Sequence, residues 1–82
     1  YLACVAYLDE QLGKILDALD RGPHAANTVV VFTSDHGFHL GEKDWVYKQT
    51  VWERSTRVPL VVVAPGISRA GEQCGRPVAL ID

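Results

Sequence analysis

Apolar residues recur with helical spacing over residues 1–20. Leucine, isoleucine and valine side chains return every three or four positions there, and charged residues occupy the opposite face. Arg21-Gly22-Pro23 then forms a strong stop signal, because glycine takes the left-handed cap and proline cannot continue the hydrogen-bond ladder. The pattern predicts one amphipathic helix over residues 1–20.

Two continuous apolar runs predict strands, at residues 28–33 and 58–64. Both are rich in β-branched residues, and neither alternates with polar positions, which is typical of a strand covered on both faces, as in a parallel sheet. Pro59 is tolerated near the start of the second strand, since the first strand residue need not donate a ladder bond. One helix is too little to cover both faces of such a sheet, so the missing layers are expected from a longer protein or another chain.

The connection between these strands, residues 34–57, is 24 residues long and mostly polar. That length suits a crossover with a short helical turn near residues 50–55. Residues 66–77 combine several glycines with polar side chains and predict an exposed loop. The order of helix, strand, long connection and strand predicts an α/β sheet domain.

Composition narrows the class of protein. The 82 residues carry a formal net charge of −2, with 48% hydrophobic and 22% charged residues, which is ordinary globular composition. It excludes a disordered acidic tail and a polybasic nucleic-acid arm, and no apolar run reaches the ~20 residues of a membrane span. Cys4 and Cys74 lack a CxxC spacing, and the ordinary interpretation of each is a buried thiol. The short length and the start at Tyr1 suggest a piece of a larger protein.

The densest group of chemically active side chains follows the first predicted strand, within Ser34–Lys43. Asp35 and His36 come where ligands bind in open α/β sheets, outside the carboxyl ends of strands. A carboxylate beside an imidazole is half of a divalent-metal site: Zn²⁺ accepts both donors, and Ca²⁺ prefers oxygen but tolerates one nitrogen. An Asx-type turn with a surface histidine fits the local pattern equally well. Gly37 suits a backbone turn or a close approach.

Two further side chains are candidates for substrate contact. Lys48, 12 residues after His36, is placed to hold an anionic substrate as a point charge, although a lone lysine is more often a solvated surface charge. His39 either faces the same site at the end of the predicted sheet or is a partly exposed structural histidine. The aromatic residues of the connection suit a sugar-binding floor or, more ordinarily, its core. These are Trp45, Tyr47 and Trp52.

Several motifs occur in the order that type I sulfatases have them. They are Asp9–Gly13, Ser34-Asp35-His36-Gly37, Leu40-Gly41-Glu42-Lys43, Trp45, Lys48, Trp52-Glu53, Arg57-Val58-Pro59-Leu60 and Pro65-Gly66. Any one motif is a weak signal, whereas the ordered set is specific. Over essentially all 82 residues the chain resembles the middle-to-late part of the large domain of formylglycine-dependent sulfatases, in the alkaline phosphatase-like superfamily. The resemblance is closest to the iduronate-2-sulfatase-like and choline-sulfatase-like branches.

The resemblance implies a mainly parallel sheet flanked by helices, incomplete in this chain. It also implies that Asp35 and His36 are ligands of the active-site divalent metal, usually Ca²⁺, and that Lys48 contacts the sulfate group. His39 has no firm family role and stays a weaker candidate for substrate binding. The family nucleophile, a cysteine or serine of a C/S-x-P/A-x-R motif converted to formylglycine, matches neither Cys4 nor Cys74. The resemblance therefore implies no catalytic nucleophile in these residues and no sulfatase activity for them alone.

The implied activity of the full-length protein is hydrolysis of the sulfate ester of a sugar or another small alcohol. The remainder of the sulfatase domain is then the structural partner of residues 1–82, and neither nucleic acid nor a membrane span is expected. One alternative is a phosphonate or phosphate ester hydrolase of the same superfamily, with Zn²⁺ or Mn²⁺. Another is a non-catalytic interaction module that folds alone. The compartment is not encoded here; the resemblance alone implies an exported, periplasmic or lysosomal-type protein.

Overall fold

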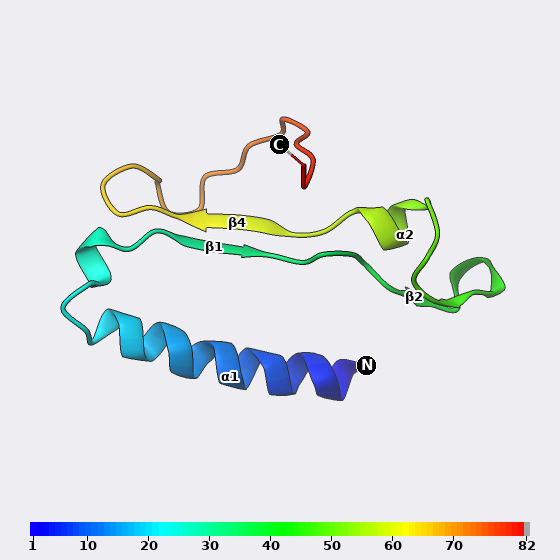
Figure 1. The fold of residues 1–82 in the computed structure, drawn as a ribbon, viewed down its shortest axis with the longest axis horizontal. Helices are drawn as coiled ribbons and strands as arrows, with labels where there is room; N and C mark the ends of the chain where they lie inside the picture. Colours follow the sequence, from blue (N-terminus) through cyan, green and yellow to red (C-terminus); the bar gives the residue numbers. More distant parts are fainter. Residues whose placement is uncertain (82) are drawn as a thin grey trace.

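A long helix lies beside a pair of strands in the computed structural model, which describes residues 1–81 (Figure 1). Asp82, the last residue of the predicted sulfatase segment 1–82, lies outside the described residues. The helix is α1 (Leu2–Asp20), and the strands are β1 (Val30–Thr33) and β4 (Leu60–Val63). The molecule is elongated, with principal extents of 48 × 31 × 21 Å.

Helix α1 ends where the sequence places the stop signal. The backbone N–H of Gly22 donates to the carbonyl oxygen of Leu19 at 2.9 Å. The exposed face carries ion pairs one turn apart, such as Lys14 with Glu10 at 2.7 Å. The opposite face of the helix lines an apolar groove of about 470 Å³, whose other wall is formed by the strands. The helix predicted over residues 1–20 is therefore observed from Leu2 to Asp20.

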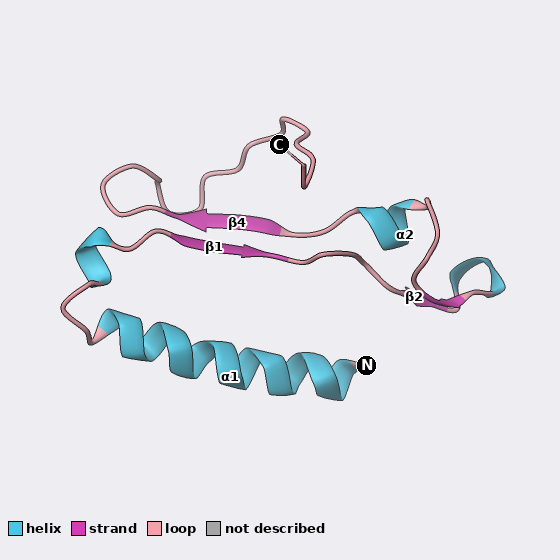
Figure 2. Ribbon diagram, in the orientation of Figure 1, coloured by secondary structure: helices cyan, strands magenta, loops and turns pink. Residues whose placement is uncertain are grey.

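Strands β1 and β4 pair antiparallel, with Val30 opposite Val63 and Thr33 opposite Leu60. A crossover between parallel strands is therefore the wrong expectation for this pair. The physical reason is that a continuous β-branched run indicates a strand whose two faces are both covered, but it carries no information about the direction of the neighbouring strand. The connection returns the chain along β1, so the carboxyl end of β1 and the amino end of β4 lie at the same end of the ladder (Figure 2).

The connection 34–57 contains short elements of its own. Strands β2 (His39–Leu40) and β3 (Val46–Tyr47) form an antiparallel hairpin around a 3-10 turn at Glu42–Asp44. One helical turn, α2 (Glu53–Thr56), follows and leads into β4. The short helical turn expected near residues 50–55 is therefore observed slightly later, and the hairpin is a feature that the sequence pattern did not predict.

Most side chains of this chain are open to solvent. Among the described residues the buried ones are Ala64, His39 and Ser55, and β4 is exposed along its whole length. Both cysteine thiols are free and exposed, so the expectation of buried thiols is wrong for the described residues. The predicted loop 66–77 is also exposed. No helix within residues 1–81 is long and apolar enough to cross a membrane.

Candidate functional site

Asp35 and His36 lie immediately after β1, in a bend of the chain lined by polar groups. The hydroxyl of Ser34 donates to the carbonyl oxygen of His36 at 2.8 Å, and the backbone N–H of His36 donates to Asp35 Oδ1 at 3.0 Å. The second oxygen of the same carboxylate, Oδ2, lies 3.3 Å from His36 Nε2. The carboxylate–imidazole pair is therefore present, whereas an Asx-type turn is not, because Asp35 Oδ1 accepts the adjacent N–H and not the one two residues on.

The hydrogen bonds of His36 assign its tautomer. Its Nδ1 lies 2.9 Å from the carbonyl oxygen of Gly37, which only accepts, so the ring proton is on Nδ1. Nε2 is then a bare acceptor, and Lys48 Nζ donates to it at 2.6 Å. When one ring nitrogen of a histidine donates a hydrogen bond to a backbone carbonyl, the other ring nitrogen is commonly oriented toward a metal ion.

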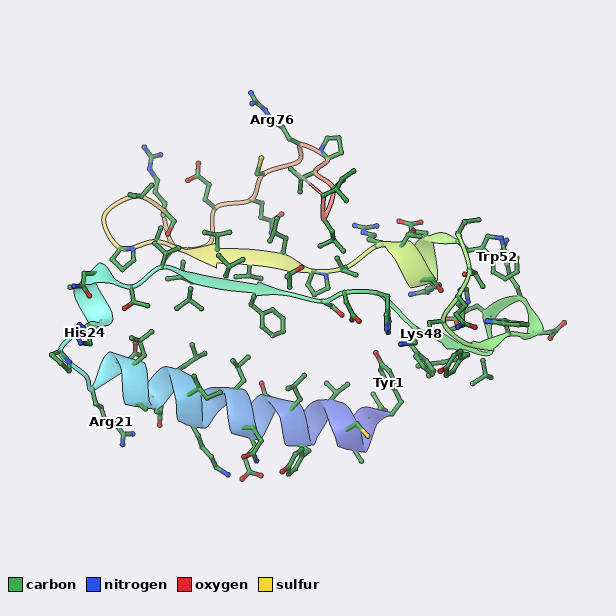
Figure 3. The ribbon with its side chains drawn as sticks, in the orientation of Figure 1. Tyr1, Arg21, His24, Lys48, Trp52 and Arg76 are labelled. Atoms are coloured by element: carbon green, nitrogen blue, oxygen red, sulfur yellow. The ribbon has the colours of Figure 1, made fainter. Side chains whose placement is uncertain are left out.

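Lys48 reaches His36 from the end of the hairpin. Its side chain is half-buried, and its backbone carbonyl accepts a hydrogen bond from Trp45 Nε1 at 3.1 Å. The residues on both sides have positive φ angles, 127° at Tyr47 and 70° at Gln49. Such angles are uncommon for residues with a side chain and are seen where surrounding contacts impose them. Figure 3 shows Lys48 at the hairpin end of the molecule.

The residues present fit one side of a divalent-metal site. Oδ2 of Asp35 and Nε2 of His36 are lone-pair donors 3.3 Å apart, a separation that one cation spans with bonds of about 2.0–2.6 Å. Such a pair attracts positive charge, and the Lys48 ammonium group supplies it by donating a hydrogen bond to His36 Nε2. No group of three or more ligating side chains occurs within residues 1–81, so Asp35 and His36 are two candidate ligands of an incomplete coordination shell.

Gly37 joins this bend to the far end of the connection. Its backbone N–H donates to the carbonyl oxygen of Ser55 at 2.8 Å. A Cβ atom at Gly37 would overlap the backbone carbonyl of Arg54, so only glycine permits this approach. The close contact brings α2 against the bend that carries His36.

His39 is placed differently from the other candidates. It is 1% exposed, its Nε2 lies 2.9 Å from Thr50 Oγ1, and its ring meets Trp52 edge-on at 5.5 Å between centroids. Its Nδ1 is buried without a hydrogen-bond partner among the described residues. The structure thus brings Asp35, His36 and Lys48 together and buries His39 within the hairpin region. Substrate contact by His39 stays a prediction.

Glu42 fastens the hairpin turn, which agrees with the structural role that the resemblance implies for it, namely to hold the loop in place. Its Oε2 accepts the backbone N–H of Leu40 at 2.8 Å, and its Oε1 lies 3.3 Å from Arg54 Nε. The hydrogen bond from Leu40 is the main reason that the pKa of the Glu42 carboxyl is lowered, and the Arg54 charge acts in the same direction. Glu42 therefore links β2, the turn and α2.

The aromatic side chains of the connection are partly exposed rather than core-forming. Trp45, Tyr47 and Trp52 keep 43%, 48% and 39% of their surface open. Phe38 packs against Tyr1 at 5.7 Å and against Tyr47 at 5.8 Å between ring centroids. These contacts tie the start of α1 to the hairpin.

Comparison with known proteins identifies the class. The sulfatase family model matches residues 1–82, and the chain belongs to the sulfatase family. This confirms the resemblance drawn from the ordered motifs. Sulfatases generally use a divalent metal ion, which agrees with the predicted class of cofactor.

Individual relatives are similar over most of this chain. A sulfatase of Formosa agariphila is 43% identical over 81 residues, which cover 99% of this chain and 16% of the relative. The iduronate 2-sulfatase of Mus musculus is 48% identical over 80% of this chain and 12% of its own length. The choline-sulfatase of Rhizobium meliloti is 43% identical over 83% of this chain and 13% of its own length. The chain thus spans less than a fifth of these relatives, and no solved structure matches it.

Proposed function

We propose that these residues form one side of the active site of a sulfatase that hydrolyses sulfate esters. The observation that carries the proposal is the convergence of Asp35, His36 and Lys48. Two lone-pair donors and one ammonium group meet within 2.6–3.3 Å, although Lys48 lies 12 residues from His36 in the sequence. A sulfate ester in such a site requires positive charge around its oxygens, and these groups supply or recruit it.

Each residue then has a distinct role. Asp35 Oδ2 and His36 Nε2 would hold the divalent ion, Ca²⁺ in the sulfatase assignment, with the His36 ring fixed by Gly37. When bound, that ion supplies Lewis-acid polarisation of the sulfate oxygens. Lys48 exchanges its hydrogen bond to His36 for one to a sulfate oxygen and neutralises negative charge there. The lysine is thus a substrate-binding residue, and none of these groups is the nucleophile.

The nucleophile and the remaining metal ligands would belong to other parts of the complete protein. A formylglycine precursor motif is absent from these 82 residues. The same interpretation places β1 and β4 in a larger, mainly parallel sheet of the alkaline phosphatase-like kind, in which antiparallel neighbours are compatible with a mixed sheet. The remainder of that domain would cover the exposed faces of both strands.

The proposed substrate class is supported by the names of the related proteins. Relatives carry the names iduronate 2-sulfatase, N-acetylglucosamine-6-O-sulfatase and choline-sulfatase. A sulfated sugar or the sulfate ester of another small alcohol is therefore the proposed substrate of the complete protein. The exposed aromatic residues beside Lys48 suit stacking against a sugar ring.

The proposal is tested with Lys48→Ala in the complete protein. Steady-state turnover of a sulfate ester is measured beside that of a phosphate ester of the same alcohol. We expect at least a 100-fold loss of kcat/KM for the sulfate ester, because one charge-assisted contact to the reacting group is worth about 2.7–4 kcal/mol. Lys14→Ala, which removes an exposed ion pair on α1, serves as the matched control. Wild-type kinetics for Lys48→Ala, or faster turnover of the phosphate ester by the wild-type protein, contradict the proposal.

The metal assignment needs its own measurement. Asp35→Ala and His36→Ala are purified in the complete protein, and bound Ca²⁺, Zn²⁺ and Mn²⁺ are counted by elemental analysis. We expect each substitution to lower the occupancy of one divalent metal sharply while Lys14→Ala leaves it unchanged. Unchanged metal content in both site variants removes Asp35 and His36 from the coordination shell.

A further inference from the structure

We propose that His39, Thr50 and Ser55 form a hydrogen-bonded clamp that positions Lys48 and His36 for the sulfate group. The three side chains are called the His39 clamp below. This inference rests on the proposed function, because it assigns a purpose to the geometry of the site. It makes His39 a positioning residue instead of a substrate contact.

The His39 clamp crosses the connection from one end to the other. His39 lies in β2, and its Nε2 is 2.9 Å from the hydroxyl oxygen of Thr50. That hydroxyl donates to Ser55 Oγ at 2.9 Å. His39 and Ser55 are 1% and 5% exposed, so these bonds form away from water, where an unmade hydrogen bond is costly.

The order of donors and acceptors in the clamp is assigned from the bond between the two hydroxyl groups. The hydroxyl proton of Thr50 is assigned to Ser55, so Thr50 Oγ1 is an acceptor toward His39. His39 therefore carries its proton on Nε2 and donates it to Thr50. Its Nδ1 is then a bare acceptor, and that buried atom has no hydrogen-bond partner among the described residues.

The His39 clamp acts on both halves of the proposed site. Thr50 stands two residues after Lys48, with Gln49 at a φ of 70° between them. Such a backbone angle is imposed by its surroundings. The anchor at Thr50 therefore fixes the direction in which the Lys48 side chain points away from the backbone. At the other end, the carbonyl oxygen of Ser55 accepts the N–H of Gly37, the residue that orients the His36 ring.

A second anchor completes the arrangement around the lysine. Trp45, three residues before Lys48, donates from Nε1 to the carbonyl oxygen of Lys48 at 3.1 Å. The backbone of Lys48 is therefore anchored by Trp45 before it and Thr50 after it in the chain, and its ammonium group meets His36 Nε2 at 2.6 Å. Groups that orient a site residue in this way commonly change affinity or activity by about 10–100-fold when removed.

The experiment uses two isosteres of His39 in the complete protein. The amide nitrogen of glutamine in His39→Gln reaches the position of Nε2 and keeps the donor to Thr50, whereas the amide nitrogen of asparagine in His39→Asn reaches that of Nδ1. Sulfate ester kinetics and the inhibition constant for inorganic sulfate are measured for both. We expect His39→Asn to lose 10–100-fold in kcat/KM and to bind sulfate at least 5-fold more weakly, and His39→Gln to stay within about 3-fold of wild type.

Thr50 supplies the reciprocal test. Thr50→Ser keeps the hydroxyl and should retain wild-type kinetics, whereas Thr50→Val removes it and should resemble His39→Asn. The double variant of His39→Asn and Thr50→Val should lose no more than the worse single variant, because both remove the same bond. His24→Asn is the matched control, since His24 lies at the far end of the molecule from Lys48 (Figure 3).

The outcomes separate this inference from the proposed function. Equal loss in His39→Gln and His39→Asn, or additive loss in the double variant, overturns the His39 clamp. Wild-type sulfate inhibition in His39→Asn also overturns it, since a merely structural role lowers stability without moving the sulfate affinity of the folded protein. Loss in Lys48→Ala with wild-type behaviour in His39→Asn overturns the clamp and leaves the proposed function intact. Wild-type kinetics in Lys48→Ala overturn both.

Discussion

At the scale of residues, Asp35 serves two purposes with two oxygens. Oδ1 accepts a hydrogen bond from the adjacent backbone N–H of His36, and Oδ2 faces the His36 ring. Sequence patterns presented the carboxylate–imidazole pair and an Asx-type turn as alternatives. The pair is observed, and the contact of Oδ1 with the adjacent N–H is too local to form an Asx-type turn.

Gly37 provides a residue-scale prediction. Gly37→Ala in the complete protein should lower the free energy of unfolding by about 1–3 kcal/mol, because its methyl group overlaps the carbonyl of Arg54. Gly13→Ala is the matched control: a methyl group there meets nothing within 4 Å, and alanine favours a helix interior by about 0.5–1 kcal/mol. Thermal denaturation of both variants checks the difference. Equal melting temperatures for the two variants contradict the close approach.

Glu42 provides a prediction on pH. Its folded-state pKa is lowered, so the carboxylate stabilises the folded protein fully above the unfolded pKa of about 4.3 and loses that effect as the pH falls through the lower, folded value. Glu42→Gln removes the charge with little change of shape. The difference in melting temperature between wild type and Glu42→Gln should therefore be largest near pH 7 and shrink below about pH 4. A difference that stays constant over that range contradicts the assignment.

At the scale of elements, helix α1 was the easiest to predict and the hairpin the hardest. The helical period and the stop at Gly22 are local signals, so the observed bounds differ from the predicted ones by one residue. Strands β1 and β4 were found from their β-branched runs, but their direction depends on a partner distant in sequence. Strands β2 and β3 are two residues long, which is too short for any periodic pattern to appear.

The candidate site was predictable to a similar degree. Asp35 and His36 follow a recognisable strand, and the ordered motifs pointed to Lys48. The burial of His39 and its bond to Thr50 arise from tertiary packing, which spacing along the chain does not encode. Glu42 belongs to the motif that carried the resemblance, but its partner Arg54 comes from a different element and could be found only in the structure.

The hairpin end gives an element-scale prediction. Gln49 has a φ of 70°, which glycine adopts freely and β-branched residues adopt at a cost of about 1–2 kcal/mol or more. In the complete protein Gln49→Gly should keep the melting temperature at or near the wild-type value, and Gln49→Val should lower it. Because the change displaces the neighbouring Lys48, Gln49→Val should also reduce kcat/KM for a sulfate ester. Equal behaviour of the two variants contradicts a backbone conformation imposed at this position.

At the scale of the whole molecule, the chain exposes far more surface than a compact protein of its mass. A folded monomer of 9.0 kDa has an accessible surface of about 4,900 Å², whereas this chain exposes 7353 Å². Its radius of gyration is 15.7 Å, against about 12 Å for a compact chain of the same length. Ala64 is the one apolar residue that is buried among those described. The apolar sides of α1 and of both strands therefore lack the contacts that stabilise a domain.

This excess surface leads to the last prediction, which concerns residues 1–82 prepared alone. Because burial of apolar area is the main favourable term in folding, the isolated chain should show no cooperative thermal unfolding transition. It should also bind a hydrophobic dye, associate in solution and turn over no sulfate ester, since the proposed nucleophile is outside it. Circular dichroism during heating, sedimentation and an activity assay check the three points. A sharp unfolding transition of a monomer would instead support the interaction-module alternative, in which these residues fold and act without the rest of a sulfatase domain.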